Sequence, residues 1–256
     1  MRADQNHPEG SGGAGRPLEE LHLVVFSRAP EPGRTKTRLI PALGEREAAR
    51  FHAACLNTTL EVVERWRNQL SQSGRPVPRG HLYITPPGSQ PLFRQAGVRW
   101  PHGWAWRNQR GENLGQRMAA AIADVWCGGK GKTERRPGVI IVGSDLPLLE
   151  ETHLEAAARM LETRDAVFGP CPDGGYYLVG SRVNEPGLFD LQTWGGSEVL
   201  TGTLEAAGRL GLSCGLIESL PDVDTAEDIR QVLSHPLAER LSSRPALELL
   251  RKYRAS

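Results

Sequence analysis

Apolar runs of strand length alternate with stretches of helical periodicity along most of this 256-residue chain. Unbroken apolar runs predict strands buried on both faces of a sheet, at 21–26 and 138–143. Shorter runs predict further strands at 81–85, near Val98, and at 166–169, 176–180 and 212–217. Apolar residues spaced three or four apart predict helices at 44–70, 91–96, 113–125, 151–161, 198–210, 226–233 and 246–253. This alternation predicts an α/β sheet covered by helices on both faces.

The alternating pattern occupies residues 21–235, which we interpret as one domain. Residues 1–20 combine Gly, Pro and charge without an apolar segment, so they predict a disordered leader and no secretory signal. Residues 236–256 predict a helical tail. No apolar run approaches the roughly 20 residues of a membrane span, and the four cysteines form no CxxC pair. We therefore expect reduced thiols and a cytoplasmic location.

Positive charge is concentrated in one loop, although the formal charge of the chain is only +1 and favours neither nucleic acid nor a membrane surface as a partner. Arg28, Arg34, Lys36 and Arg38 follow the first predicted strand, and Glu31 alone offsets them in that loop. A buried strand that opens into a basic loop and then a helix is a common way to hold phosphates. The alternative is a surface loop with solvated charges. We favour a nucleotide-phosphate site formed by Ser27, Arg28, Ala29, Pro30, Gly33, Arg34, Lys36 and Arg38.

A carboxylate follows the predicted strand at 138–143. Ligands of α/β sheets lie beyond the carboxyl ends of the strands, so Lys36 and Asp145 are expected to face one crevice as catalytic residues. A carboxylate in that position can hold Mg²⁺ or Mn²⁺ through hard oxygen ligands. The alternative is that Asp145 caps the helix that begins after Pro147.

Two more carboxylates precede the predicted helix at 226–233. Thr225 and Asp228 have the spacing of a capping pair, which leaves Asp222 and Asp224 without a structural role. One of these two could complete the metal shell, and we favour Asp224. The predicted cofactor is therefore Mg²⁺ or Mn²⁺, bound by Asp145 and Asp224.

A tight turn contains Asp173, Gly174 and Gly175, because glycines allow positive φ angles and close backbone approach. Turn formation alone would explain these residues. The functional alternative is that Asp173 hydrogen-bonds the hydroxyl of an acceptor, with Tyr176 nearby. The turn is thus a candidate acceptor site.

Three further features have two explanations each. Asn113 and Arg117 stand at a predicted helix start, where Asn113 either caps the helix or borders the nucleotide. His153 is expected on a polar face of its helix and solvated rather than catalytic. A tryptophan cluster is expected to pack on the core rather than to stack on a base; its members are Trp100, Trp104 and Trp106.

These motifs resemble the bacterial glycosyltransferase-like family that is also described as radical-SAM/selenodomain-associated transferase 1. The matching segments extend over about residues 21–233 and comprise 26–39, 109–118, 142–145, 169–170 with 173–178, and 222–225. The resemblance implies a three-layer α/β/α, Rossmann-like domain of the GT-A type that binds a nucleotide-diphosphate sugar or an NTP. It also implies that Asp145 stands where GT-A enzymes keep a metal-binding aspartate.

Three positions depart from the family pattern. Arg28 stands where the family often has Lys, which keeps the charge, and Asn113 stands where it usually has Asp, which removes a carboxylate. The resemblance implies an acceptor contact near Trp194, and there Gly195 and Gly196 replace the Ser-Thr that the family tends to have.

We therefore expect a metal-dependent transferase that moves a glycosyl group from a nucleotide-diphosphate sugar to a small-molecule acceptor. One alternative is a nucleotidyltransferase that joins an NTP to a phosphorylated small molecule and releases pyrophosphate. A second is a nucleotide-binding protein without catalysis, which Asn113 and the glycines after Trp194 favour. The sequence predicts neither the base, sugar and acceptor nor the oligomeric state.

Overall fold

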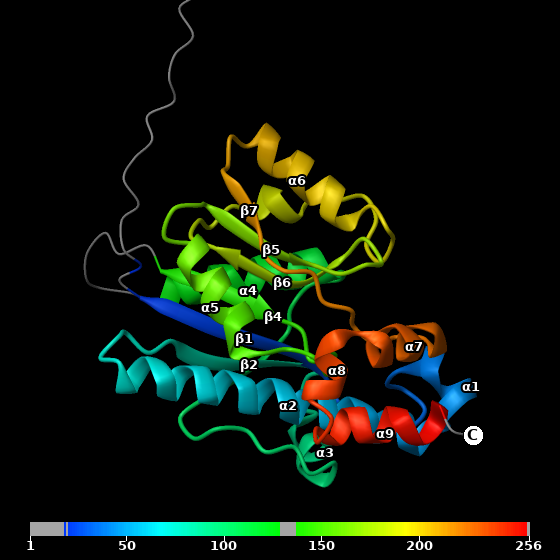
Figure 1. Cartoon of the computed structure of the whole chain (residues 1–256). Coiled ribbons are helices and arrows are strands. Elements are labelled where there is room, and N and C mark those ends of the chain that lie inside the picture. The colour runs from blue at the N-terminus through cyan, green and yellow to red at the C-terminus, as the bar shows by residue number, and fades with distance from the viewer. Residues whose placement is uncertain (1–17, 19, 129–136, 255–256) are drawn as a thin grey trace, which may run out of the picture.

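A computed structural model describes residues 18, 20–128 and 137–254. At its centre lies a seven-stranded sheet with the order β3-β2-β1-β4-β6-β5-β7 (Figure 1). Among these strands β6 runs antiparallel to its neighbours, and the other pairs are parallel. The predicted fold class, a mostly parallel α/β sheet, is confirmed. The strands are β1 (Leu21–Arg28), β2 (Arg79–Thr85), β3 (Ala105–Asn108), β4 (Gly138–Val142), β5 (Ala166–Pro170), β6 (Tyr176–Ser181) and β7 (Cys214–Leu216).

Helices cover both faces of this sheet, because its central strands are apolar on both sides. Leu23 and Val25 of β1 belong to one core cluster with α2, α3, α5 and α7–α9. Val24 and Phe26 belong to a second cluster with α4, η2 and α6. The helices are α1 (Ile40–Leu43), α2 (Glu45–Gln72), α3 (Gln90–Gln95), α4 (Leu114–Gly128), α5 (Glu151–Met160), α6 (Val199–Arg209), α7 (Ala226–Ser234), α8 (Pro236–Arg240) and α9 (Pro245–Arg254), with short 3-10 helices η1 (Thr37–Leu39) and η2 (Pro186–Phe189).

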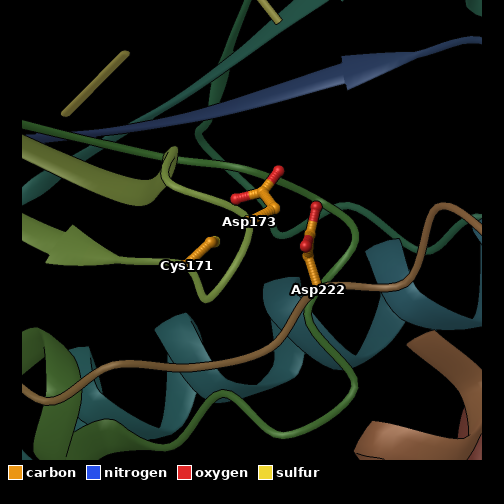
Figure 2. Close-up of side chains that lie close together, drawn as sticks. All are labelled: Cys171, Asp173 and Asp222. Atoms are coloured by element: carbon orange, nitrogen blue, oxygen red, sulfur yellow. The ribbon is translucent and has the colours of Figure 1, made fainter. Parts of the chain in front are cut away.

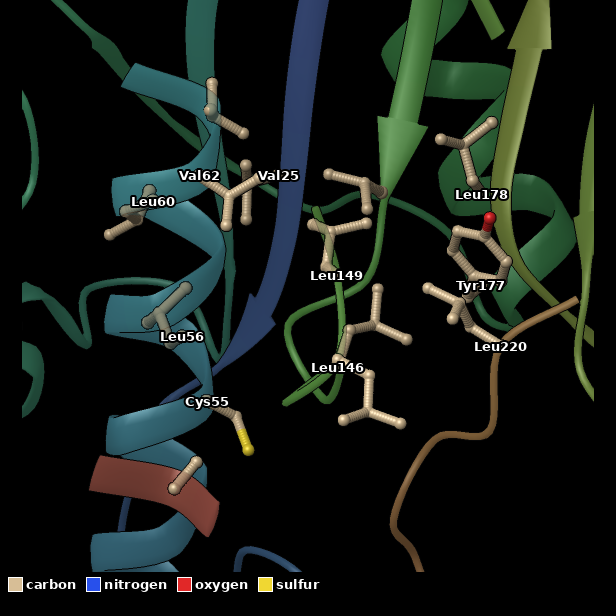
Figure 3. Packing of buried hydrophobic residues seen from close by; sticks show 14 of the residues in the cluster. Val25, Cys55, Leu56, Leu60, Val62, Leu146, Leu149, Tyr177, Leu178 and Leu220 are labelled. Atoms are coloured by element: carbon tan, nitrogen blue, oxygen red, sulfur yellow. The ribbon is translucent and has the colours of Figure 1, made fainter. Parts of the chain in front are cut away.

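The long helix α2 connects the sheet to the loop that follows β4. It begins after Gly44, whose φ is +77°, and the acidic residues of its first turn favour the helix dipole. Figure 3 shows Cys55 and Val62 of α2 on the side of β1 and of the loop that carries Leu146 and Leu149. These four side chains are almost fully buried, so α2 and the loop after β4 share one core.

The strand predicted near Val98 is wrong. Val98 is buried in a loop, where its backbone nitrogen donates to the Phe93 carbonyl, and the third strand lies later, at β3. The packing role of the tryptophans is confirmed: Trp104 is 7% exposed, and Trp106 meets Phe93 and Trp100 edge to face. Two of these aromatic residues lie next to or within β3, so packing decides where the chain pairs with β2.

The C-terminal helices pack on α2 and α7 rather than standing apart. Arg244, between α8 and α9, donates to the carbonyls of Pro147 and Leu149, at 2.8 and 2.7 Å. Arg240 of α8 pairs with Glu150 at 2.7 Å. Residues 236–254 therefore hold the loop between β4 and α5.

The predicted leader, residues 1–20, lies outside the described residues except for Leu18 and Glu20, as do the last two residues of the predicted tail. Within the described part of the chain, each helix is too short or too polar to cross a membrane.

Candidate active site

Hydrogen bonds within the loop after β1, and one to the end of β2, define the conformation of this loop. The backbone nitrogen of Ala29 donates to a carbonyl at the end of β2, at 2.8 Å. Thr35 is 2% exposed; its hydroxyl donates to the Ala29 carbonyl and accepts from the backbone nitrogen of Glu31. Gly33 has a φ of +78°, which side-chain-bearing residues rarely adopt. These contacts define the path of the loop up to Lys36.

Lys36 points inward from this basic loop. Its side chain is 5% exposed, and Nζ lies 2.9 Å from Oδ2 of Asp145 and 3.6 Å from Oδ1 of Asp224. Burial alone would lower the pKa of Lys36, but the two facing carboxylates outweigh burial and raise the pKa. Lys36 also has a φ of +52°, an uncommon backbone state for a residue other than glycine. Such a conformation at a charged contact points to a functional constraint.

Asp145, which follows β4, has two basic partners. Lys36 contacts Oδ2, and Nδ1 of His52 lies 2.7 Å from Oδ1. Burial would raise the pKa of Asp145, but Lys36 and His52 hold it well below its usual range. The residue that caps α5 is Glu150, so helix capping does not account for Asp145. The structure thus brings Lys36 and Asp145 into direct contact.

His52 is a site residue that the sequence analysis missed. It lies on α2, is 2% exposed, and interrupts an otherwise apolar stripe that includes Ala48, Phe51 and Cys55. A titratable side chain on the buried face of a helix was the available signal, because buried polar groups need partners. Asp145 is one of these partners.

The three arginines of the loop lie nearer to solvent. Arg28 is exposed at the end of β1. The side chain of Arg34 is 77% exposed, with Glu31 at 3.7 Å, and that of Arg38 is 70% exposed, with Asp224 at 2.9 Å. Exposed ion pairs of this kind contribute little to stability, so these guanidinium groups can take new partners.

A second acidic group lies beside this pair. Figure 2 shows Cys171 and Asp173, from the turn after β5, pointing toward Asp222, from the segment before α7. One donor atom from each of the three lies within 4.8 Å of the others. Among the described residues, the Asp222 carboxylate has neither a hydrogen bond nor an ion pair. Burial raises the pKa of Asp222 to about 6; Lys36 opposes this shift, and Asp173 adds to it.

The place where a divalent ion would fit depends on which carboxylate oxygens still lack partners. Asp145 and Asp224 already contact the basic side chains of Lys36, His52 and Arg38 in this structure. Asp222 and Asp173 instead offer carboxylate oxygens of the kind that Mg²⁺ and Mn²⁺ prefer. Burial raises the pKa of the Cys171 thiol, which keeps it protonated and a poor ligand at neutral pH. The open oxygen donors are therefore those of Asp222 and Asp173.

The turn that carries Asp173 is clamped against a distant loop. Oδ1 of Asp173 accepts from the backbone nitrogen of Gly175 at 2.9 Å. Gly174 has a φ of +88°, and a Cβ there would lie 1.9 Å from the carbonyl oxygen of Ser197. Tyr176, by contrast, buries its hydroxyl and packs its ring on Phe168, so its geometry is that of a core residue rather than an acceptor ligand.

The predicted helix start near Asn113 lies beside the Trp194 loop. Oδ1 of Asn113 accepts from the backbone nitrogen of Gln116 at 2.9 Å, so Asn113 caps α4. Arg117 donates to the Gly111 carbonyl at 3.0 Å. Trp194 packs so closely on α4 that a Cβ on Gly115 would lie 2.2 Å from its ring. A cavity of about 260 Å³ adjoins these elements; it is lined by Asn113, Gly115, Gln116, Ala119, Pro186, Gly187, Phe189, Asp190 and Leu191.

Several predicted residues have structural duties instead. Ser27 is 2% exposed and donates to the Arg28 carbonyl, and Ala29 and Pro30 are buried, with the amide of Ala29 already bonded. The expectation of a solvated His153 is wrong: it is 3% exposed and forms the capping box of α5 with Glu150. The paired capping residues predicted before α7 are confirmed.

The comparisons agree with this architecture. A protein of Desulfovibrio desulfuricans G20, provisionally assigned as a nucleotide-diphospho-sugar transferase, is 26% identical over 92% of this chain and 95% of its own, with a TM-score of 0.76. The 4-diphosphocytidyl-2C-methyl-D-erythritol synthase of Anaerococcus prevotii DSM 20548 is 10% identical over 84% of this chain and 96% of its own, with a TM-score of 0.52. A protein of Mycobacterium tuberculosis H37Rv is 17% identical over 85% and 100%, with a TM-score of 0.50.

The fold and the comparisons confirm the resemblance to GT-A-like, nucleotide-sugar-transferase-like proteins that the sequence showed. Residues 70–196 match the family described as an uncharacterized protein conserved in bacteria (DUF2064). No curated protein matches the sequence. At a coarse level these findings support a nucleotide-binding transferase, without distinguishing glycosyl from nucleotidyl transfer.

Proposed function

We propose that this protein is a transferase that takes a glycosyl group from a nucleotide-diphosphate sugar, with the diphosphate bound at the carboxyl ends of β1 and β4. The observation that carries the proposal is the buried Lys36, which bridges Asp145 and Asp224 beneath a loop of exposed arginines. A charged cluster of this kind is rarely built for stability alone, because desolvation offsets much of its attraction. It does provide a preorganised field for a charged ligand.

The arginines of the loop bind the diphosphate. Arg28, Arg34 and Arg38 are exposed and close together in sequence, and guanidinium groups match phosphate oxygens with paired hydrogen bonds. Arg38 can leave its exposed contact with Asp224 at little cost. Lys36 stays on Asp145 and supplies a fixed positive charge below the phosphates.

Asp222 and Asp173 would hold a divalent ion, Mg²⁺ or Mn²⁺. The raised pKa of Asp222 reflects burial beside other carboxylates, and the donor geometry of the pair suits a hard cation. An ion held there would supply positive charge against the negative charge of the departing nucleotide diphosphate.

Transfer then requires an acceptor hydroxyl near Asp173. The acceptor oxygen attacks the anomeric carbon, and the bond from that carbon to the diphosphate oxygen breaks with its electron pair. Asp173 is exposed, and a carboxylate has about four acceptor sites on its two oxygens, so the oxygen that does not bind the ion can orient the acceptor or take its proton.

Turnover of radiolabelled nucleotide sugars tests this proposal. A thermal-shift screen of nucleotide-diphosphate sugars and NTPs with Mn²⁺ selects the donor, since a ligand that binds the native state raises the melting temperature. The selected donor is then incubated with candidate acceptors, and release of the nucleoside diphosphate is measured. The matched control is Arg209→Ala, an exposed arginine on α6, against Arg28→Ala in the loop.

Nucleotidyl transfer is the second candidate. Three exposed arginines in one loop suit a triphosphate, and the 4-diphosphocytidyl-2C-methyl-D-erythritol synthase has the same fold. An NTP consumed only with a phosphorylated acceptor, with pyrophosphate released, would establish this reaction and exclude glycosyl transfer. Nucleotide binding that ignores both Mg²⁺ and Asp222→Ala, without turnover of any donor, would instead support the non-catalytic alternative.

A further inference from the structure

The cavity between the start of α4 and η2 has no part in the chemistry described so far. Its volume is about 260 Å³, below the size of most pockets for drug-sized ligands, so it suits a small molecule. Gly115 of α4 forms part of its wall, where a Cβ would lie 2.2 Å from the ring of Trp194 and 2.6 Å from the carbonyl oxygen of Phe189. This close packing fixes the position of α4 against the opposite wall.

Two amide side chains in the wall have donors to offer. Oδ1 of Asn113 accepts from the backbone nitrogen of Gln116 at 2.9 Å, and Oε1 of Gln116 accepts from that of Glu112 at 2.8 Å. A backbone N–H can only donate, so each amide must turn its oxygen toward it and keep its NH₂ group for another partner. Among the described residues, neither NH₂ group has such a partner.

A single carboxylate also lines the cavity. Asp190 is exposed, and within the described part of the chain its side chain forms neither a hydrogen bond nor an ion pair. The described residues of the lining include no lysine, arginine or histidine. Arg117, on the first turn of α4, is outside the lining and donates to the Gly111 carbonyl at 3.0 Å. The cavity therefore presents neutral donors and one negative charge.

The rest of the wall is apolar, except for one buried donor close to it. The apolar lining comes from Ala119, Pro186, Phe189 and Leu191. Nε1 of Trp194 is buried and has no hydrogen-bond partner among the described residues. Cε2, its neighbour in the ring, lies 2.6 Å from the Cβ position of Gly115, so this donor lies close to the wall. Buried N–H groups are nearly always paired, which points to a ligand group as the missing acceptor.

The segment of residues 190–198 connects the cavity to the acidic turn after β5. It starts in the wall at Asp190. Near its other end, the carbonyl oxygen of Ser197 lies 1.9 Å from the position that a Cβ on Gly174 would take. Gly174 directly follows Asp173, the residue to which the proposed reaction gives the acceptor hydroxyl. One segment thus contacts both the cavity and the proposed reaction centre.

We propose that this cavity binds the acceptor, and that the acceptor is an uncharged, polyhydroxylated small molecule rather than a phosphate ester. A hydroxyl group can donate to the Asp190 carboxylate and accept from the NH₂ groups of Asn113 and Gln116. A phosphate ester can only accept, and Asp190 repels it without a cation in the lining to offset the repulsion. The acceptor role rests on the proposed function and deepens it, because nucleotidyl transfer would need a phosphorylated acceptor.

Saturation-transfer NMR of the full chain without nucleotide tests the class of ligand. The probes are D-glucose and myo-inositol, each compared with its monophosphate. We expect at least one of the two polyols to bind with a millimolar dissociation constant and its phosphate to bind at least about tenfold more weakly. Equal binding of polyol and phosphate, or binding of neither polyol, would overturn the proposal.

A variant that fills the cavity tests the location. Ala119→Leu adds volume at the wall with a residue that helices favour, and we expect polyol binding to fall at least about tenfold. Ala123→Leu, one turn further along α4 and outside the lining, is the matched control and should bind like the unchanged chain. Equal losses in the two variants would indicate a general disturbance of α4 and contradict the proposal.

A second variant tests the charge. Asp190→Asn keeps the shape of an exposed side chain, so it should fold even if Ala119→Leu does not. We expect polyol binding to weaken about fivefold and the difference between polyol and phosphate to shrink. A phosphate that Asp190→Asn excludes as strongly as the unchanged chain does would show that this carboxylate is not the reason.

These results are separate from the test of the proposed function. Polyol binding requires no donor, so a lack of nucleotide-sugar turnover would contradict the proposed function and leave the ligand class of the cavity established. Turnover with a polyol acceptor whose KM is unchanged in Ala119→Leu would do the reverse. It would support the proposed function and exclude the cavity as the acceptor site.

Discussion

Buried histidines lie at both ends of the central strands, in opposite surroundings. At the carboxyl end of β1, His52 meets a carboxylate and a carbonyl oxygen. Near the other end, His22 of β1 and His81 of β2 stack with ring centroids 5.1 Å apart, and their facing nitrogens lie 2.9 Å apart. Each of the three residues is less than a tenth exposed. Burial alone therefore does not distinguish them.

The groups that surround each histidine ring distinguish the two ends of the sheet. Burial, together with the basic neighbours His22, Arg107 and Arg79, lowers the pKa of His81 to about 4. At the site, a carboxylate and a carbonyl oxygen lie against the ring of His52. The same kind of side chain thus packs among basic groups at one end of the sheet and beside a carboxylate at the other.

The largest expected effect comes from removing the acid of the charged group. Asp145→Asn leaves Lys36, whose side chain is 5% exposed, without its nearest counter-charge, and leaves His52 without its carboxylate partner. We expect a loss of roughly 2–4 kcal/mol in the free energy of unfolding at pH 7, measured by urea denaturation. Because the folded pKa of Asp145 is lowered, its contribution is present above about pH 4 and is lost as the pH falls further.

Asp224→Asn is the matched control, because the side chain of Asp224 is 42% exposed. Its loss should be about 1 kcal/mol or less. A loss as large as that of Asp145→Asn would contradict the distinction between the two carboxylates.

Acidification should lower the free energy of unfolding through His81, at the opposite end of the sheet. Unfolded His81 binds a proton near pH 6.5, whereas the folded residue does so only near pH 4, so acidification between these values favours unfolding. We expect roughly 1–3 kcal/mol of this acid-induced loss to disappear in His81→Gln. Denaturation curves at pH 7 and pH 5 measure it, with His102→Gln as the exposed control. An unchanged pH dependence would indicate that His81 is already charged in the folded protein.

The carboxylate of Asp222, which lacks a direct ion pair among the described residues, should change stability in the opposite sense with pH. The pKa of Asp222 is raised to about 6, mainly by burial, so its charged form destabilises the fold as the pH rises from about 4 through 6. Asp222→Asn is expected to raise the free energy of unfolding at pH 8 by roughly 1 kcal/mol and to weaken Mn²⁺ binding. A variant less stable than the unchanged chain at pH 8 would contradict this account.

The smallest effect on stability is expected at the exposed edge of the loop. The side chain of Arg34 is 77% exposed, so Arg34→Ala should change the free energy of unfolding by about 0.5 kcal/mol or less. Pyrophosphate affinity should still fall by about threefold at low salt, and less at high salt. Arg209→Ala on α6 is the control, and equal losses of affinity in both variants would point to a nonspecific charge effect.

Much of the fold followed from the sequence because its signals were local. The apolar runs of β1 and β4 and the capping pair Thr225 and Asp228 depend on residues close together in the chain. The meeting of Lys36 and Asp145 followed from topology, since parallel strands bring their carboxyl ends to one edge.

The errors arose where distant contacts decide. Val98 has the composition of a strand residue, but pairing with β2 occurs at Trp106 and its neighbours instead. His153 sits in a helix of ordinary polarity, and its burial depends on Tyr177, whose ring it meets edge to face. His52 was missed because its partner, Asp145, is 93 positions away.

Arg244 connects the C-terminal helices to the proposed reaction centre. Its guanidinium donates hydrogen bonds to the carbonyls of Pro147 and Leu149, a few residues after Asp145. The last two helices should therefore act as a remote reporter. Ligand binding near Asp145 should slow deuterium uptake in α9. A bulky tag fused after α9 should increase deuterium uptake in the loop between β4 and α5, although the tag does not contact that loop.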